Sequence, residues 1–220
     1  MTKIAFLLLT FLPLLTCGQE TKLITDKKNN EIYSVLKFDK SKKHGIYKKF
    51  NFDGSVKIIG NYKFGVQDSI WEFHNYKGEL QQKFDFTERR LLYYKLNDKT
   101  KDDKYRIYNG NNIQEPTTLE RPPIYIGSDA VMFESIFKSL KYPKEAMESG
   151  TSGKVLISFK INQKGETSDF KVKSGIGHGC DEEALRVVKN IPPNWLPGLL
   201  SGKPVEVEYI LPISFQVTDI

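Results

Sequence analysis

The sequence predicts an N-terminal all-β hairpin-repeat module followed by an α+β C-terminal domain. The expected sheet of that domain is antiparallel and three-stranded, with two to three helices. Three patterns support this division. Turn motifs recur 24 residues apart, at 51–54 and 75–78, which is typical of a repeated supersecondary unit. Apolar residues of helical period lie within 131–140, and apolar residues occupy every odd position from 205 to 217.

The composition is that of a folded, basic chain. Its 220 residues suggest one or two domains, and 39% hydrophobic with 12% aromatic residues supports a globular core. The formal net charge is +6, but positive and negative residues are interspersed, so we expect no nucleic-acid partner. The excess positive charge indicates either a solvated surface or attraction to an anionic membrane or cell wall.

The first 17 residues have the pattern of a secretory signal peptide. Lys3 precedes an apolar run of 13 residues, 4–16, which is too short to span a membrane. Residues 14–18, Leu-Leu-Thr-Cys-Gly, resemble a lipobox, which implies cleavage before Cys17 and lipidation of its thiol. The alternatives are plain cleavage near Gln19 and a retained anchor. We expect the polar residues 18–31 to form a tether.

The all-β module is expected over residues 32–108. Asp53-Gly54 and Lys77-Gly78 are hairpin turn signals, since glycine tolerates the positive φ of such turns. The repeat, with Gly60, Tyr62, Trp71 and Phe73 among its landmarks, resembles MORN-type repeats of the bacterial variant. Residues 91–96 and 104–108 are expected to form one further hairpin, and 109–123, with three prolines, to form a linker.

The C-terminal domain, 124–220, is expected to begin with a helix capped by Asp129 and stopped before Pro143. The apolar face of this helix is expected at Met132, Phe133, Ile136, Phe137 and Leu140. A short second helix follows Pro143.

Strand patterns at 153–161 and 167–174 flank the Lys164-Gly165 turn and predict an antiparallel hairpin. Asp181 is expected to cap a further helix, with Ala184, Leu185, Val188 and Ile191 on its buried face. The alternating residues 205–217 predict a final strand with one buried face, on which Pro212 favours an edge. Trp195 is expected in the core.

An ordered set of motifs in this domain resembles the C-terminal domain of TonB-family energy transducers. The set includes Tyr142-Pro143, Val172-Lys173-Ser174-Gly175, Asp181-Glu182-Glu183-Ala184-Leu185, Trp195-Leu196-Pro197-Gly198 and Gly202-Lys203-Pro204-Val205. The resemblance implies a periplasmic binding module that takes up a receptor peptide as an added strand. It implies two groups of partner-binding residues. The first is Lys141, Tyr142 and Pro143 near the second helix. The second lies on the final strand, within Val205–Phe215, where Val205, Glu206, Val207, Glu208 and Tyr209 are singled out. The alternative is that these side chains only complete the fold.

The sequence departs from the family in lacking a membrane-spanning helix and a long proline-rich spacer. We therefore expect an exported, lipidated protein of the periplasm that binds an envelope partner, for which an outer-membrane transporter is the candidate implied by the resemblance. The alternative is a scaffold lipoprotein that forms homodimers or binds envelope components without energy transduction.

The pattern of reactive residues does not favour catalysis. Cys17 and Cys180 are the two cysteines, so a disulfide framework is excluded. His178 and Cys180 lack an evident third group for a nucleophilic triad or a metal site. Residues 175–179 are glycine-rich, but Cys180 stands where the dinucleotide-binding motif requires its last glycine. We expect no enzymatic activity, no cofactor and no metal.

The lipobox predicts that Cys17 anchors the protein. Cys17→Ser should move the protein from the membrane fraction to the soluble periplasm, because no thiol remains to be acylated. Fractionation with labelling by a fatty-acid analogue measures this. Membrane association that persists in the variant would contradict the anchor.

Overall fold

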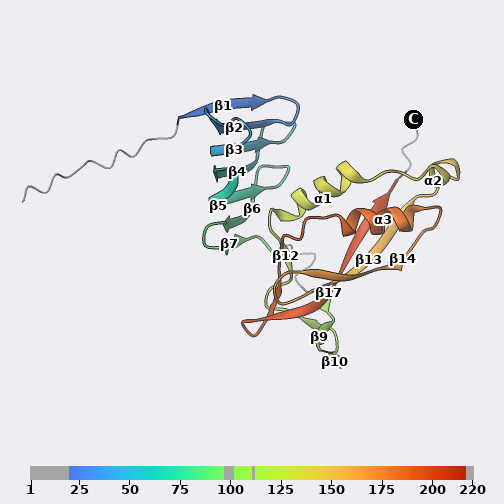
Figure 1. Cartoon of the computed structure of the whole chain (residues 1–220). Coiled ribbons are helices and arrows are strands. Elements are labelled where there is room, and N and C mark those ends of the chain that lie inside the picture. The colour runs from blue at the N-terminus through green and yellow to red at the C-terminus, as the bar shows by residue number, and fades with distance from the viewer. Residues whose placement is uncertain (1–19, 97–101, 111, 217–220) are drawn as a thin grey trace, which may run out of the picture.

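The computed structural model describes residues 20–96, 102–110 and 112–216. Its first part is a β-rich region and its second part an α+β region, as expected (Figure 1). The signal segment, Cys17 and Val217 lie outside the described residues. The elements of the first region are β1 Thr21–Asp26, β2 Glu31–Leu36, β3 Lys43–Phe50, β4 Val56–Lys63, β5 Val66–His74, β6 Leu80–Asp85 and β7 Arg90–Tyr94.

These strands form one antiparallel meander, in the order β1-β2-β3-β4-β5-β6-β7. The two expected turns match each other. Asn51 O accepts a hydrogen bond from Gly54 N–H at 3.1 Å, and Asn75 O accepts one from Gly78 N–H at 3.0 Å. The Asn51 side-chain amide donates to Asn75 O at 3.2 Å, so adjacent repeats are tied together at the same end of the sheet.

Trp71 organises the buried face of this sheet. Its side chain is 2% exposed, stacks on Tyr47 and meets Tyr62 edge-on. The indole N–H donates to Asn61 O at 3.0 Å. Gly60 lies directly beneath the indole, where an added Cβ would be 2.2 Å from Trp71 Cδ2.

Two expectations for the first region are wrong. The expected tether contains β1, which pairs with β2 from Thr21↔Leu36 to Asp26↔Glu31. Backbone hydrogen bonds to β2 are enough to hold such an edge strand in place, so its sequence need not alternate between apolar and polar residues. The expected hairpin of 91–96 with 104–108 does not form, because β7 pairs with β6 and the later segment joins other strands.

The second region contains three helices and two small sheets besides its main one, within the described residues. The helices are α1 Ser128–Ser139, α2 Lys144–Glu148 and α3 Cys180–Lys189. The strands are β8 Lys104–Tyr105, β9 Ile107–Asn109, β10 Asn112–Ile113, β11 Thr117–Thr118, β12 Ile124–Tyr125, β13 Gly153–Ile161, β14 Thr167–Ser174, β15 Trp195–Leu196, β16 Gly198–Leu200 and β17 Lys203–Phe215.

The main sheet is larger than the three strands expected. Its order is β10-β9-β17-β13-β14, with β16 also paired to β17. Strand β17 pairs with β13 without interruption, from Val207↔Ile161 to Phe215↔Gly153. The helices cover one face of this sheet (Figure 1). The core residues between them include Met132, Ile136, Ala184, Val188 and Trp195, which is 5% exposed as expected for a core residue.

The helix starts differ from expectation. Helix α1 has Gly127 at its N-cap with φ 112°, and Asp129 makes no capping hydrogen bond. Phe137, expected on the apolar face, is 62% exposed. Asp181 accepts hydrogen bonds from Ile176 N–H and Gly177 N–H in the preceding loop, so it fixes the entry to α3 without capping its end.

The expected linker, 109–123, is part of the folded domain. Strand β11 pairs with β8 through Thr117↔Tyr105, and Arg121 exchanges backbone hydrogen bonds with Leu199. Leu119 is only 7% exposed. The boundary expected at 108/109 is therefore wrong, because the second region takes in residues from β8 onward.

The two regions share buried polar contacts. The amide of Gln82, 0% exposed, donates to Tyr125 O at 3.1 Å and accepts from Gly127 N–H at 2.7 Å. Glu134 on α1 binds Lys49 at 2.7 Å and Lys57 at 2.5 Å, both from the first sheet. These contacts hold the first turns of α1 against the first region.

Gly60→Ala should destabilise the first region by about 3 kcal/mol, because the packed rings leave the indole no space to move. Denaturant unfolding followed by circular dichroism measures this. Trp71→Leu should cost less in the Gly60→Ala protein than in the original, since the smaller side chain relieves the clash. If the effects of the two substitutions on the free energy of unfolding were strictly additive, the contact between Gly60 and Trp71 would be contradicted.

Glu134 should make stability depend on acid pH. Burial alone would raise the pKa of this carboxyl, but hydrogen bonds from Lys138, Lys49 and Lys57 outweigh burial and lower the pKa to about 2. The folded pKa is below the reference value of 4.5, so the stabilisation is complete above pH 4.5 and is lost as the pH falls towards 2.

Glu134→Gln should therefore lower the free energy of unfolding by about 2 kcal/mol at pH 7 and flatten its decline between pH 5 and 2. Chemical unfolding at several pH values measures both effects. Glu148→Gln, which removes an exposed carboxylate paired with Lys144 at 3.4 Å, is the matched control and should change little. If the free energy of unfolding of the two variants depended on pH in the same way, the proposed effect of the lysines around Glu134 would be contradicted.

Candidate functional site

The residues predicted on the final strand lie on two faces of β17. Val207 is 0% exposed, and Tyr209 packs on Trp195 and Phe159. Glu206 and Glu208 lie on the opposite face, since side chains alternate along a strand. On that face Glu208 Oε2 binds Arg106 Nη1 at 3.0 Å, and Glu206 Oε1 lies 3.8 Å from Lys160 Nζ.

The backbone edge beside these residues is already occupied by the protein itself. Strand β9 pairs with Glu206 and Val207 on this outer edge, whereas β16 pairs with Val205 on the side of β13. The Glu208 N–H donates to Arg106 O at 3.0 Å. The expected open edge at Val205–Tyr209 is therefore wrong: a partner strand could pair there only after β9 had left.

The open part of the edge begins at Ile210. Because Glu208 N–H points away from β13, the regular alternation directs the backbone groups of Ile210, Pro212 and Ser214 to the same side. Within the described chain no strand pairs with β17 on this side beyond Val207. Pro212 has no N–H, so the edge offers two donors, from Ile210 and Ser214, together with three carbonyl groups.

The other predicted group lies at the far end of the same strand. The Tyr142 ring meets the Phe215 ring edge-on at 5.6 Å, and its hydroxyl donates to Thr151 O at 2.5 Å. Tyr142 is half-buried, whereas Lys141 is exposed and its N–H donates to Glu183 Oε1. Pro143 precedes α2 and packs near Gly179. Tyr142 therefore packs on the core and also marks where the open edge ends.

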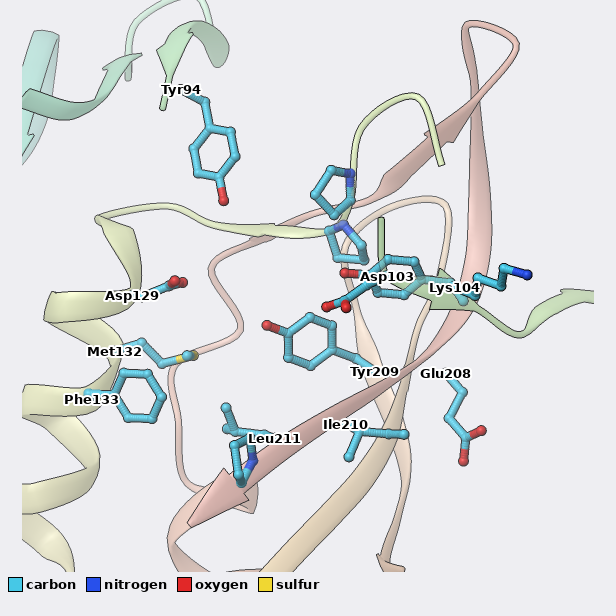
Figure 2. A pocket seen from close by; sticks show the side chains of 14 residues that line it. Tyr94, Asp103, Lys104, Asp129, Met132, Phe133, Glu208, Tyr209, Ile210 and Leu211 are labelled. Carbon is cyan, nitrogen blue, oxygen red and sulfur yellow. The ribbon is translucent and has the colours of Figure 1, made fainter. Parts of the chain in front are cut away.

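A cavity of about 500 Å³ lies at the start of the open edge. Four elements line it: β7, β8, α1 and residues 208–212 of β17. Figure 2 shows Asp103 and Asp129 on opposite sides of this cavity, each with its carboxylate directed into it. The hydroxyls of Tyr94 and Tyr209 are directed into the same space.

The pKa values of the tyrosines that line the cavity are raised, so their hydroxyls stay protonated. Burial, then the negative charge of Asp129, raises the pKa of Tyr94 to about 12. Burial, Asp103, Tyr94 and Asp129 raise the pKa of Tyr105 to about 12. The pKa of Tyr209 is also raised, first by burial and then by Asp129. These hydroxyls are therefore neutral donors at neutral pH.

Asp129 is desolvated by its surroundings although water still reaches it through the cavity. Burial raises the pKa of its carboxyl. Its position in the first turn of α1 favours the charged form, because the helix N-terminus is electropositive. Neither Asp129 nor Asp103 forms an ion pair with another described residue.

The other reactive residues do not assemble into a site. Cys180 is 0% exposed, as expected for a structural thiol, and burial raises its pKa. His178 Nδ1 lies 2.8 Å from Thr151 Oγ1. Among the described residues no group of three His, Cys, Asp or Glu side chains could hold a metal ion.

Comparison with known families supports the C-terminal assignment. Residues 138–217 match the family model of the Gram-negative bacterial TonB protein C-terminal domain. The match supports a TonB C-terminal domain in this segment and a TonB-like role in envelope transport or interaction. It does not extend to the first region, for which the resemblance to MORN repeats stays a prediction.

No curated protein and no solved structure matched the chain. In the part that the structure describes, no helix has both the length and the apolar character needed to cross a membrane.

Sequence reasoning did not single out Ile210 and Ser214 within the implied stretch Val205–Phe215, and it missed the two aspartates as binding residues. The outward direction of a backbone N–H follows from strand pairing, which no side-chain pattern reveals. Pro212 was the available signal, since proline on a strand indicates an unpaired side. Asp129 was assigned to a helix cap, which Gly127 occupies instead.

Proposed function

We propose that this protein is an exported, lipid-anchored envelope protein whose TonB-like domain binds an extended segment of a partner. The segment adds as a strand along Ile210, Pro212 and Ser214 of β17. The observation that carries the proposal is the open outer edge from Ile210 onward, on a strand whose other edge is paired with β13 from Val207 to Phe215. The role is binding, without catalysis.

Main-chain pairing supplies the affinity in this mode of recognition. Unpaired N–H and C=O groups at a sheet edge are a ready template for an extended peptide. The open stretch from Ile210 to Phe215 spans about 17 Å, at 3.3 Å per residue. Four to six residues of a partner would cover it, from the cavity at one end to Tyr142 at the other.

The partner class follows from the family match. Domains of this type interact with envelope proteins such as outer-membrane transporters, so a transporter segment is the proposed partner. Lys141 and Pro143, beside the end of the open edge, would contact the folded part of that partner.

The second candidate is a scaffold role, which the same observation favours, because the open edge of one copy can pair with that of another.

Ile210→Pro tests strand addition, since it removes one outward N–H and leaves the pairing with β13 untouched. Pro212 already occupies an equivalent outward position, so the variant should fold with an unchanged circular dichroism spectrum. Capture of partners from envelope extracts should be lost in Ile210→Pro and kept in Ile210→Ala, which retains the N–H.

Amide hydrogen exchange provides the direct measurement. Exchange at Ile210 and Ser214 should slow when the partner binds, because each N–H then donates to it. A folded Ile210→Pro protein that keeps its partners would show the proposed edge to be wrong. Slowed exchange caused by self-association, detected by sedimentation, would favour the scaffold role.

A further inference from the structure

The cavity at the open edge is placed to receive one side chain of an added strand. In a sheet, residues directly opposite each other direct their side chains to the same face. Tyr209 and Leu211 direct theirs to the face covered by α1, where the cavity lies. A partner residue opposite Tyr209 or Leu211 would therefore point into the cavity.

The cavity has an apolar wall and polar acceptors. Met132 and Phe133 of α1 line one side together with Leu211. Asp129 lies one turn earlier on the same helix, and Asp103 faces it across the space (Figure 2). This arrangement suits a long methylene chain that ends in a cation, because such side chains bury their stems and keep the charged end hydrated or paired.

Among the described residues, no cation neutralises the two aspartates of the cavity. Glu208 lies beside the cavity, but its carboxylate is on the other face of β17, where it is paired with Arg106. The ammonium of Lys104 points away from the cavity in Figure 2. Asp103 and Asp129 have no ion-pair partner in the described residues, so no described side chain competes with a ligand for their charge. The aromatic rings of Tyr105 and Tyr209, 6.5 Å apart, add a surface that favours cations.

We propose that the cavity selects partner segments carrying lysine or arginine at the position opposite Tyr209 or Leu211. This inference rests on the proposed strand addition and specifies its partner: an extended peptide with a basic side chain that inserts between Asp103 and Asp129. The open edge accepts the backbone, and the cavity distinguishes one sequence from another.

The test uses purified exported protein and three fluorescent peptides of seven residues. Each alternates threonine and valine and carries lysine, glutamine or glutamate at its centre. At low salt the lysine peptide should bind about tenfold more tightly than the glutamate peptide, measured by fluorescence anisotropy. In the double variant Asp103→Asn, Asp129→Asn this preference should fall to about threefold or less. Glu148→Gln removes one negative charge outside the cavity and should leave the preference unchanged.

The outcomes separate this inference from the proposed function. Equal binding of the three peptides, abolished by Ile210→Pro, would leave strand addition standing and overturn the basic-residue selection. A lysine preference that persists in the double variant would also overturn it, because the charge would be sensed elsewhere. Failure of all three peptides to bind would count against the edge itself and against both proposals.

Discussion

The uninterrupted pairing of β17 with β13 is the constraint on which the rest of the second region depends. It commits one edge of β17 to β13 from Val207 to Phe215 and leaves the other edge to be satisfied independently. It also determines which side chains enter the core, since Val207, Leu211, Ile213 and Phe215 are all buried on one face. The protein covers only part of the second edge, with β9, whereas β16 pairs with β17 on the same side as β13. Because this pairing is incomplete, the rest of the outer edge of β17 is open. The cavity beside it and the inward direction of the Tyr209 side chain follow from the same arrangement.

The side-chain patterns of the sequence were sufficient for much of the fold. Alternation on β17 and the two Asn-to-Gly turns predicted a strand and hairpins that the structure contains, because burial and positive φ select particular side chains at those positions. Strand β1 escaped detection for the opposite reason, because its pairing depends on main-chain groups that every residue carries and its exposed positions impose little choice of side chain. The segment 104–108 was recognised as a strand but given the wrong partner, since side-chain patterns do not specify which strand it joins. Phe137 shows the same limit, since its helical spacing cannot reveal that no neighbour covers it.

The candidate site could be located only to within one strand. The family resemblance pointed to the stretch Val205–Phe215, and Val205 to Tyr209 were singled out, but β9 comes from residues 107–109, outside the segment 138–217 that the family model matches. A segment beyond the matched domain cannot be placed by analogy with it. The proposed site consequently lies in the later part of that stretch, beyond the pairing of β9 with Val207.

The N-terminal region contributes to the site beyond any role as a spacer. Tyr94, on the last strand of the first sheet, forms a wall of the cavity, while α1 supplies Asp129 on another side. Their separation is maintained by Gln82, which binds the backbone on both sides of Ile126, and by Glu134, which binds Lys49 and Lys57. A displacement of the first region would move Tyr94 away from Asp129 without altering the edge of β17. The proposed backbone pairing therefore depends on the second region alone, whereas the shape of the cavity depends on both regions.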